Sequence, residues 1–371
     1  MSCSTKIRTG TASNFSKCSS RVLLGVISEH SHSDSSTSDE GKEAVLSDIS
    51  IVMIGRGSML QNCVAIAEEV PGVSVKKVFL KERLGDTGRY LTAFFKKHHV
   101  ECIAYQHIST VKESLVRTSG ELDLLISAYN EDRLDSELLS RFTRKINFHP
   151  SPLPRYGGLS PESWAILAGE SVHGATWHVM APELDIGDIV SQQLFKLDPS
   201  WTAYDVALEC TRTGCRLFKP LLIDLTQDKL TCRSQDPHER SYFTRKVLPF
   251  GGRFPFQVGY EIAERLRRAT AYFPMPNPFC TPTVTIGNTT VGLVRFSVHA
   301  EADVALPGTI IAADKDSVSF AMAGGVLKVN LVLLPGGKCV RSTDPAALAL
   351  LTVGSRAAVE DKTYDAMGLS I

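Results

Sequence analysis

Several features that would assign this sequence to a common class are missing. Its nine cysteines are scattered, odd in number and without a C-x-x-C pair, which argues against a disulfide framework or a structural zinc site. No apolar run approaches the roughly 20 residues that a membrane span needs. With 40 basic and 40 acidic residues, the chain also lacks the basic field that supports non-specific nucleic-acid binding. We therefore expect a reduced cytoplasmic protein without a resident metal.

Residues 1–47 differ in composition from the rest of the chain. The first 28 residues contain four basic side chains and no acid, and residues 30–42 are polar and free of aliphatic side chains. Such a composition cannot bury a core, so we expect a disordered leader. An organelle transit peptide is the alternative.

Residues 48–230 alternate between apolar β-type runs and helical periodicity. Such alternation predicts an α/β domain with a Rossmann-like, mostly parallel sheet, covered on both faces. The expected strands are residues 49–54, 73–80, 101–105, 122–127 and 145–148, and the expected helices are residues 59–70, 90–99 and 132–142.

The turn after the first expected strand reads Gly55-x-Gly57, but Leu60 stands where a dinucleotide fingerprint needs its third glycine. A nucleotide site is therefore not expected at this turn. Ligands of such sheets bind beyond the carboxyl ends of the strands.

The sequence pattern changes after residue 230. Residues 231–280 read as a linker with a helix at 262–271. Residues 281–356 contain short alternating runs separated by Gly or Asp-Lys-Asp turns, which predict a small C-terminal β-barrel of OB-like type. Residues 357–371 are expected to be a tail.

Chemistry-bearing residues gather in residues 146–189. Asn147 and His149 are two apart at a strand end, so both side chains point to one face. Prolines at 150, 152 and 154 then stop strand pairing and hold an extended loop. Asp185 and Asp188 follow later, and either carboxylate could orient the His149 ring. On these grounds alone, a purely structural role for these residues is an equal alternative.

The segment closely resembles the N-x-H-P-S-x-L-P-x-Y-x-G … G-x-T … L-D-x-G-D-I signature of the 10-formyltetrahydrofolate-dependent formyltransferases. Every fixed position of the signature is matched, namely by Asn147, His149, Pro150, Ser151, Leu153, Pro154, Tyr156, Gly158, Gly174, Thr176, Leu184, Asp185, Gly187, Asp188 and Ile189. A weaker resemblance spans about residues 48–354.

The resemblance implies a catalytic Asn147, His149 and Asp185, with Asp188 ranked second. A substrate amine would attack the formyl carbon on N10 of the folate, Asn147 and His149 would donate hydrogen bonds to the oxyanion, and Asp185 would stabilise protonated His149. It also implies a donor-binding region at residues 127–134, where we single out Tyr129, Asn130 and Leu134.

The sequence indicates the formyl acceptor less clearly than it indicates the catalytic residues. Where initiator-tRNA enzymes read R-G-A-A-P after the tyrosine, this chain reads residues 157–161, GGLSP, so tRNA is not favoured. Residues 173–180 and the R-A-x … P-N-P pattern of residues 268–278 resemble formylating domains of nonribosomal peptide synthesis. We expect a small amine on an amino-acid or hydroxyornithine-type scaffold, as in siderophore biosynthesis, which a carrier could present. A methionyl-tRNA or sugar-amine acceptor, and hydrolysis of the folate, are the alternatives.

Two further histidines, His173 and His178, lack carboxylate partners at the spacing of the motif. We expect them to have core or surface roles. The sequence carries no prediction of the oligomeric state.

Overall fold

The computed structural model describes residues 48–81, 87–118, 122–302 and 305–359. The expected leader at 1–47 and residues 360–371 of the expected tail lie outside these ranges. The N-terminal part contains β1 (Ile49–Gly55), α1 (Gly57–Glu68), β2 (Val73–Lys81), α2 (Thr87–Lys97), β3 (Glu101–Tyr105), α3 (Ile108–Val116), β4 (Leu122–Ala128), α4 (Ser136–Leu139), β5 (Phe142–His149), β6 (Gly157–Gly158), α5 (Pro161–Ala168), β7 (Val172–Val179), β8 (Ile189–Lys196) and α6 (Ala203–Thr226).

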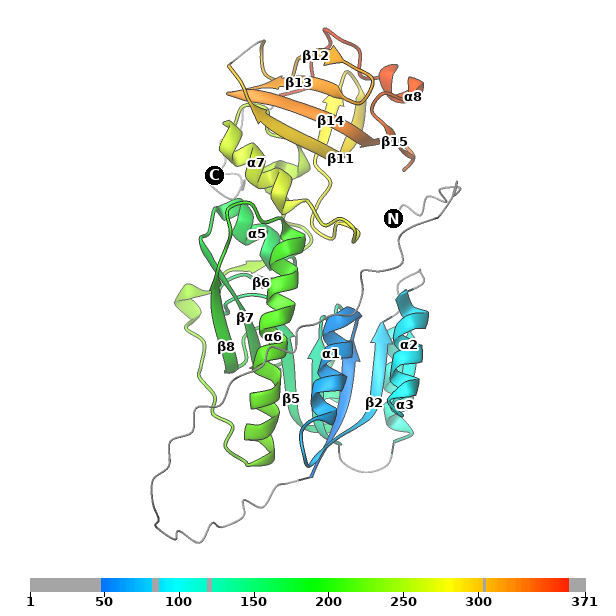
Figure 1. The fold of residues 1–371 in the computed structure, drawn as a ribbon, viewed down its shortest axis with the longest axis vertical. Coiled ribbons are helices and arrows are strands. Elements are labelled where there is room, and N and C mark those ends of the chain that lie inside the picture. The colour runs from blue at the N-terminus through cyan, green and yellow to red at the C-terminus, as the bar shows by residue number, and fades with distance from the viewer. Residues whose placement is uncertain (1–47, 82–86, 119–121, 303–304, 360–371) are drawn as a thin grey trace, which may run out of the picture. The chain divides into compact units, whose positions relative to one another are not determined.

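Seven of these strands form one sheet in the order β3-β2-β1-β4-β5-β7-β8. The strands from β3 to β5 are parallel, and β7 and β8 are antiparallel to their neighbours. Helices α1, α2 and α6 contribute to the core on one face, and α3 and α4 to the core on the other (Figure 1). The mostly parallel, doubly covered sheet that the sequence predicts is therefore confirmed.

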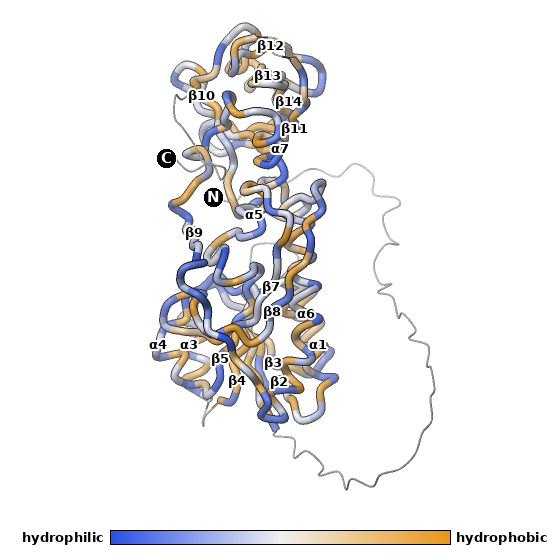
Figure 2. Tube along the Cα trace, turned by 90° about the vertical axis from the view of Figure 1, so that its left-hand side faces the viewer, coloured by the Kyte–Doolittle hydropathy of each residue, from blue (hydrophilic) through white to orange (hydrophobic). Residues whose placement is uncertain are grey.

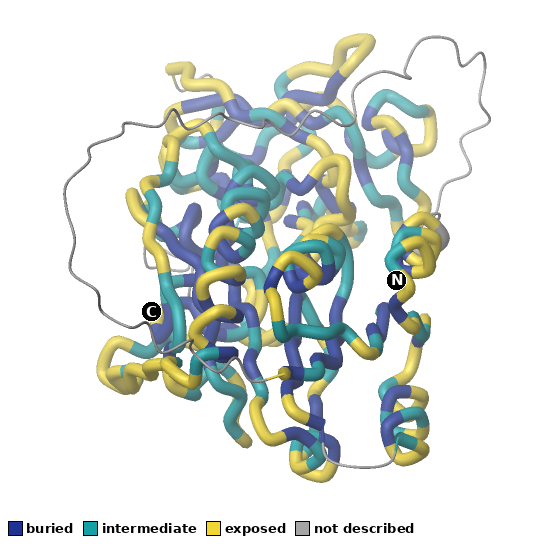
Figure 3. Tube along the Cα trace, turned by 60° about the horizontal axis from the view of Figure 1, so that its bottom comes forward, coloured by how far each residue is buried: buried dark blue, intermediate teal, exposed yellow. Residues whose placement is uncertain are grey.

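The central strands form because their sequences are apolar on both faces. Strand β1 has six buried residues of seven, and β4 has a similar pattern, as parallel strands between two helix layers require. Figure 2 shows apolar stretches around β4 and β5, and Figure 3 shows buried segments running through the interior with exposed segments at the periphery. Helix α6 begins at a capping box, in which Thr202 and Asp205 each bind the backbone N–H of the other.

The helix expected at residues 132–142 is much shorter than predicted. Residues 132–142 contain only the four-residue α4, which Asp135 caps by accepting from the Leu138 N–H. Phe142 is buried as the first residue of β5, so burial in the sheet overrides the local helical pattern. Helices α3, α5 and α6, strand β8 and the pair β6–β9 are among the additions to the predicted elements.

The connecting segment contains two short 3-10 turns, η1 (Pro237–Glu239) and η2 (Pro249–Gly252), together with β9 (Tyr242–Phe243) and α7 (Tyr260–Ala269). Strand β9 pairs in parallel with β6, joining Gly157 to Tyr242 and Gly158 to Phe243. The expected helix at 262–271 corresponds to α7.

The C-terminal strands are β10 (Thr283–Ile286), β11 (Thr289–Ala300), β12 (Ile310–Ala313), β13 (Val318–Met322), β14 (Gly325–Leu333) and β15 (Cys339–Arg341), followed by α8 (Pro345–Leu348). They form an antiparallel sheet in the order β10-β11-β14-β13-β12, with β15 on β14. Single bridges join Ile286 to Ala357 and Thr309 to Arg356. The antiparallel sheet agrees with the prediction, and the closed OB-like barrel stays a prediction.

Candidate active site

The end of β5 presents two polar side chains beside a buried aromatic one. Phe148 points into the core and packs on Trp177, with ring centroids 5.2 Å apart. Asn147 and His149, the residues on either side of it, therefore share the opposite face. His149 is only 5 % exposed, so its imidazole works largely shielded from water.

Asp185 reaches these side chains from the loop between β7 and β8. Its backbone is in the left-handed region, with φ of 58°, and its Oδ2 accepts a 2.8 Å bond from the Gly158 N–H. Its Oδ1 lies 3.7 Å from His149 Nδ1 and 3.7 Å from Nε2 of His178. Asp188, the competing carboxylate, is exposed. The structure thus brings Asn147, His149 and Asp185 together.

His178 is the residue that the sequence did not single out for this cluster. Its Nδ1 lies 2.9 Å from the Val179 carbonyl oxygen, which can only accept. The proton is therefore on Nδ1, and Nε2 accepts the 3.1 Å bond from Asn147 Nδ2. Burial lowers the pKa of His178 to about 4, against the opposing effect of Asp185. No carboxylate stands at the spacing of the motif, but the fold brings Asp185 to His178, which is buried as a core residue would be.

The His149 ring has an equally defined orientation. Its Nε2 donates a 2.9 Å bond to the Tyr156 carbonyl oxygen, so Nε2 carries a proton in every charge state of the ring. Nδ1 is then the nitrogen that faces Asp185. In the neutral ring Nδ1 is a free base, and in the charged ring it faces a carboxylate.

Side chains of β7 fix the loop at residues 150–154, where proline removes backbone donors. His173 Nε2 donates to the Pro150 carbonyl at 2.9 Å, and Thr176 Oγ1 donates to the Ser151 carbonyl at 2.6 Å. His173 is fully buried, and burial lowers its pKa to about 4, so it is neutral near pH 7. These bonds hold the peptide units that follow His149 in one arrangement.

The predicted donor-binding residues lie just beyond β4. Tyr129 donates to the Ala207 carbonyl of α6 at 3.3 Å, and Asn130 closes a turn onto the backbone of Asp132. Leu134 is 7 % exposed and belongs to the core. As donor contacts, these three residues stay predictions.

Two ion pairs anchor that segment to neighbouring strand ends. Arg56, which follows β1, lies 2.6 Å from Glu131, and Lys81, at the end of β2, lies 2.9 Å from Asp132. The segment after β4 is therefore held by ion pairs to the carboxyl ends of β1 and β2.

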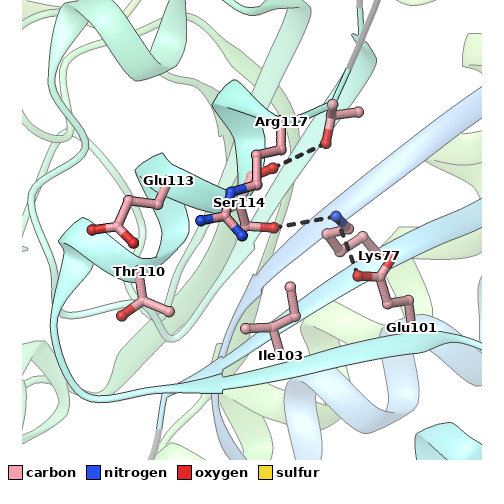
Figure 4. Close-up of a pocket in the computed structure, with 8 residues that line it drawn as sticks. Lys77, Glu101, Ile103, Thr110, Glu113, Ser114 and Arg117 are labelled. Carbon is pink, nitrogen blue, oxygen red and sulfur yellow. Dashed lines mark hydrogen bonds and ion pairs between the residues drawn. The ribbon is translucent and has the colours of Figure 1, made fainter.

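A surface pocket of about 420 Å³ lies elsewhere, beside the start of β3 and the end of α3 (Figure 4). Its lining includes Lys77, which bonds Ser114 and pairs with Glu101. Because strand β5 ends at the opposite edge of the sheet, this hollow is separate from the Asn147–His149–Asp185 cluster. The cluster, and not the hollow, is the candidate active site.

Within the described ranges, no group of three or more His, Cys, Asp or Glu side chains is arranged to hold a metal ion. In the same ranges, no helix has the length and apolar character needed to cross a membrane.

Fold and site together define an α/β enzyme with an amide donor, an imidazole base and a carboxylate at the carboxyl edge of its sheet. Amide donors, imidazoles and carboxylates are the kinds of group that acyl transfer uses. The sequence model of the family described as formyl transferase matches residues 52–217. This match agrees with the motif: the chain contains a formyl transferase domain, and it is a folate-dependent formyltransferase enzyme.

Methionyl-tRNA formyltransferase of Corynebacterium urealyticum is 28% identical over 272 residues, which are 72% of this chain and 81% of that relative. Among solved structures, the N-formyltransferase from Helicobacter canadensis in complex with folinic acid and dTDP-3-aminofucose has a TM-score of 0.55 at 17% identity, over 76% of this chain and 98% of that one. HypX from Aquifex aeolicus in complex with tetrahydrofolic acid has a TM-score of 0.58 at 14% identity, over 86% of this chain and 52% of that one. These two likenesses concern the fold.

Proposed function

We propose that this enzyme transfers a formyl group from 10-formyltetrahydrofolate to a primary amine of a small molecule. The observation that carries the proposal is the convergence of the motif residues Asn147, His149 and Asp185, with Asp185 Oδ1 3.7 Å from His149 Nδ1. The reaction forms a bond between the amine nitrogen and the formyl carbon and breaks the bond from that carbon to N10. One proton leaves the amine and one is delivered to N10.

Asn147 stabilises the oxyanion of the tetrahedral intermediate. Its amide nitrogen has two N–H groups, of which one is bonded to His178 Nε2. The second is free to donate to the formyl oxygen as negative charge develops there. One such donor typically contributes about 3 kcal/mol to lowering the barrier.

His149 moves the proton. Since Nε2 is committed to the Tyr156 carbonyl, Nδ1 of the neutral ring accepts the proton from the attacking amine. The imidazolium that forms faces Asp185, whose carboxylate stabilises it. The same Nδ1–H then serves as the acid for N10. His149 is thus assigned to proton transfer, and oxyanion stabilisation falls to Asn147.

The donor lies beside the segment after β4, where Tyr129, Asn130 and Leu134 shape the wall and the backbone offers hydrogen bonds. The two ion pairs of this segment, Arg56–Glu131 and Lys81–Asp132, support this role because they hold the wall in place without a bound ligand.

The acceptor is an amine on an amino-acid or hydroxyornithine-type scaffold, in nonribosomal peptide or siderophore biosynthesis in the cytoplasm. Support comes from residues 173–180 and from the absence of an arginine at Gly157. Methionyl-tRNA is the second candidate, because the Corynebacterium relative acts on it by name. An amino-sugar nucleotide is the third, because the Helicobacter enzyme holds one.

The test supplies 10-formyltetrahydrofolate with a pool of ornithine, hydroxyornithine, amino-sugar nucleotides and methionyl-tRNA. Mass spectrometry of the products is expected to find formylated ornithine or hydroxyornithine. Formylation of methionyl-tRNA or of a sugar alone would overturn the assigned acceptor class. Formate release that does not depend on any amine would instead identify a hydrolase, and no turnover at all would contradict the proposed activity.

A further inference from the structure

The loop that carries Asp185 is held by a side chain that the proposed chemistry leaves unused. Gln235 Nε2 donates to the carbonyl oxygen of Asp185 at 3.0 Å and to that of Gly187 at 2.7 Å. Carbonyl oxygens can only accept, so the amide nitrogen must face them and each of its two hydrogens has a partner. One amide therefore fixes two peptide units of the loop, and one of them belongs to the proposed counter-charge of His149.

The orientation of this amide serves the loop at the expense of its other end. Gln235 Oε1 is buried and has no hydrogen-bond partner in the part of the chain that the structure describes. A buried acceptor without a partner costs free energy. Turning the amide over would place Oε1 against two carbonyl oxygens, which would repel it. The contacts with Asp185 and Gly187 therefore decide how Gln235 lies.

The backbone of Asp185 needs support of this kind. Its φ of 58° lies in the left-handed region, which residues with a Cβ atom rarely adopt and which persists only where the surroundings hold it. The carboxylate of the same residue accepts from the Gly158 N–H at 2.8 Å and lies 3.7 Å from His149 Nδ1. Gly158 thus holds the side-chain end of Asp185, and Gln235 holds its backbone end.

The chain after α6 brings Gln235 to this place. Arg233 forms an antiparallel bridge with Ile189, the first residue of β8, through backbone hydrogen bonds of 2.8 and 2.9 Å. The same segment also reaches the loop before Asp185, because the Arg240 guanidinium donates to the Leu184 carbonyl at 3.4 Å. The segment therefore contacts the loop on both sides of Asp185.

We infer that Gln235 is a positioning residue of the active site, whose amide directs the Asp185 carboxylate toward Nδ1 of His149. The inference rests on the proposed function, in which Asp185 stabilises protonated His149. A misplacement of about 1 Å can lower a reaction rate by about 100-fold. Loss of the amide should therefore slow the reaction although every reacting group is still present.

The first test compares two variants of similar shape that cannot donate. Gln235→Met, and Gln235→Glu in its ionised form, should each lower kcat for formyl transfer from 10-formyltetrahydrofolate to hydroxyornithine by roughly 10- to 30-fold, because two hydrogen bonds are lost. The KM values of both substrates should stay within about threefold, since Gln235 touches neither. Gln227→Met is the matched control and should change nothing, because its neighbour Asp228 pairs with Arg144 at the start of β5, at the other edge of the sheet.

A double-mutant cycle shows whether Gln235 acts through Asp185. In an Asp185→Asn background, Gln235→Met should lower kcat by less than about twofold further, because the carboxylate that it positions is already gone. A purely structural role would lower kcat by the same factor in both backgrounds, and that result would overturn the inference.

Amide hydrogen exchange tests the placement without any turnover. The Gly158 N–H, which donates to Asp185 Oδ2, should exchange at least roughly tenfold faster in Gln235→Met and at the parental rate in Gln227→Met. Denaturant unfolding of the same proteins shows whether the whole fold is weakened.

Unchanged Gly158 exchange, together with kcat within about twofold of the parent in Gln235→Met, would overturn the inference and leave the proposed function intact. Faster Gly158 exchange in a protein that formylates no amine would contradict the proposed function and leave the placement of Asp185 by Gln235 standing.

Discussion

The two edges of the N-terminal sheet both gather charged and polar side chains, yet they differ in their contact with water. At the amino edge, Lys77 pairs with Glu101, whose side chain is 58% exposed, across an open pocket (Figure 4). At the carboxyl edge, the side chains of His149 and Asp185 are 7% and 13% exposed. Charges interact more strongly where water is excluded. The pocket at the amino edge is therefore the weaker candidate for an active site, and the buried imidazole and carboxylate at the carboxyl edge are the stronger one.

The largest effect that separates the two edges is expected from Asn147→Ala and His149→Ala. Each should lower kcat by about 10²- to 10³-fold, because the first removes an oxyanion donor and the second the proton acceptor. Single-turnover formyl transfer measures this, with circular dichroism to show that the variants are folded. Folded variants that react near the parental rate would remove the functional distinction between the edges.

The next effect concerns the two carboxylates of the β7–β8 loop. Asp185→Asn should lower kcat about 100-fold, because the imidazolium of His149 loses its counter-charge. Asp188→Asn should stay within about threefold, since this carboxylate is exposed and only its backbone carbonyl is used, by the Val179 N–H. The ratio of the two kcat values is the measurement. A larger loss from Asp188→Asn would exchange the two assignments.

A third prediction concerns stability and pH. His173 and His178 have folded pKa values of about 4, below the ordinary 6.5, so the unfolded chain binds more protons between these values. The contribution of the two neutral rings to the free energy of unfolding is fully present above pH 6.5 and is lost as the pH falls toward 4. It is on the order of 3 kcal/mol for each ring.

Denaturant unfolding at pH 7.5, 6 and 5 measures this loss. His173→Gln removes one titrating ring, so its free energy of unfolding should fall less steeply on acidification than that of the parent. The two slopes would be equal if the buried ring did not titrate in this window.

The smallest effect is expected at the amino edge. Lys77→Met leaves the pocket in place but removes its central cation, and kcat/KM should stay within about twofold. The free energy of unfolding should change by about 1 kcal/mol or less, because the partner carboxylate is solvated. A tenfold loss in kcat/KM would show that this pocket takes part in the reaction.

Much of the fold could be predicted because the signals are local. Apolar runs gave the parallel strands, and the i, i+2 spacing placed Asn147 and His149 on one face of β5. The antiparallel pair β7–β8 and the two-residue pair β6–β9 depend on partners far along the chain, for which periodicity carries no signal.

The place of His178 in the candidate site could not be predicted for the same reason. The loop carrying Asp185 folds back so closely that a Cβ on Gly187 would lie 1.8 Å from the Val179 carbonyl oxygen. This return brings the carboxylate to His178, seven positions earlier in the chain. Glycines at 157, 158 and 187 were the available signal, because each marks a close approach of two backbones.

The pairing of β9 with β6 also has a mechanical consequence. Gly158, whose N–H holds the Asp185 carboxylate, is bonded within the same two-residue ladder to the segment that leads into the C-terminal sheet. One short strand, β6, therefore both donates a hydrogen bond to the Asp185 carboxylate and pairs with the segment that continues beyond Phe243. The connecting segment is in this sense anchored beside the candidate active site.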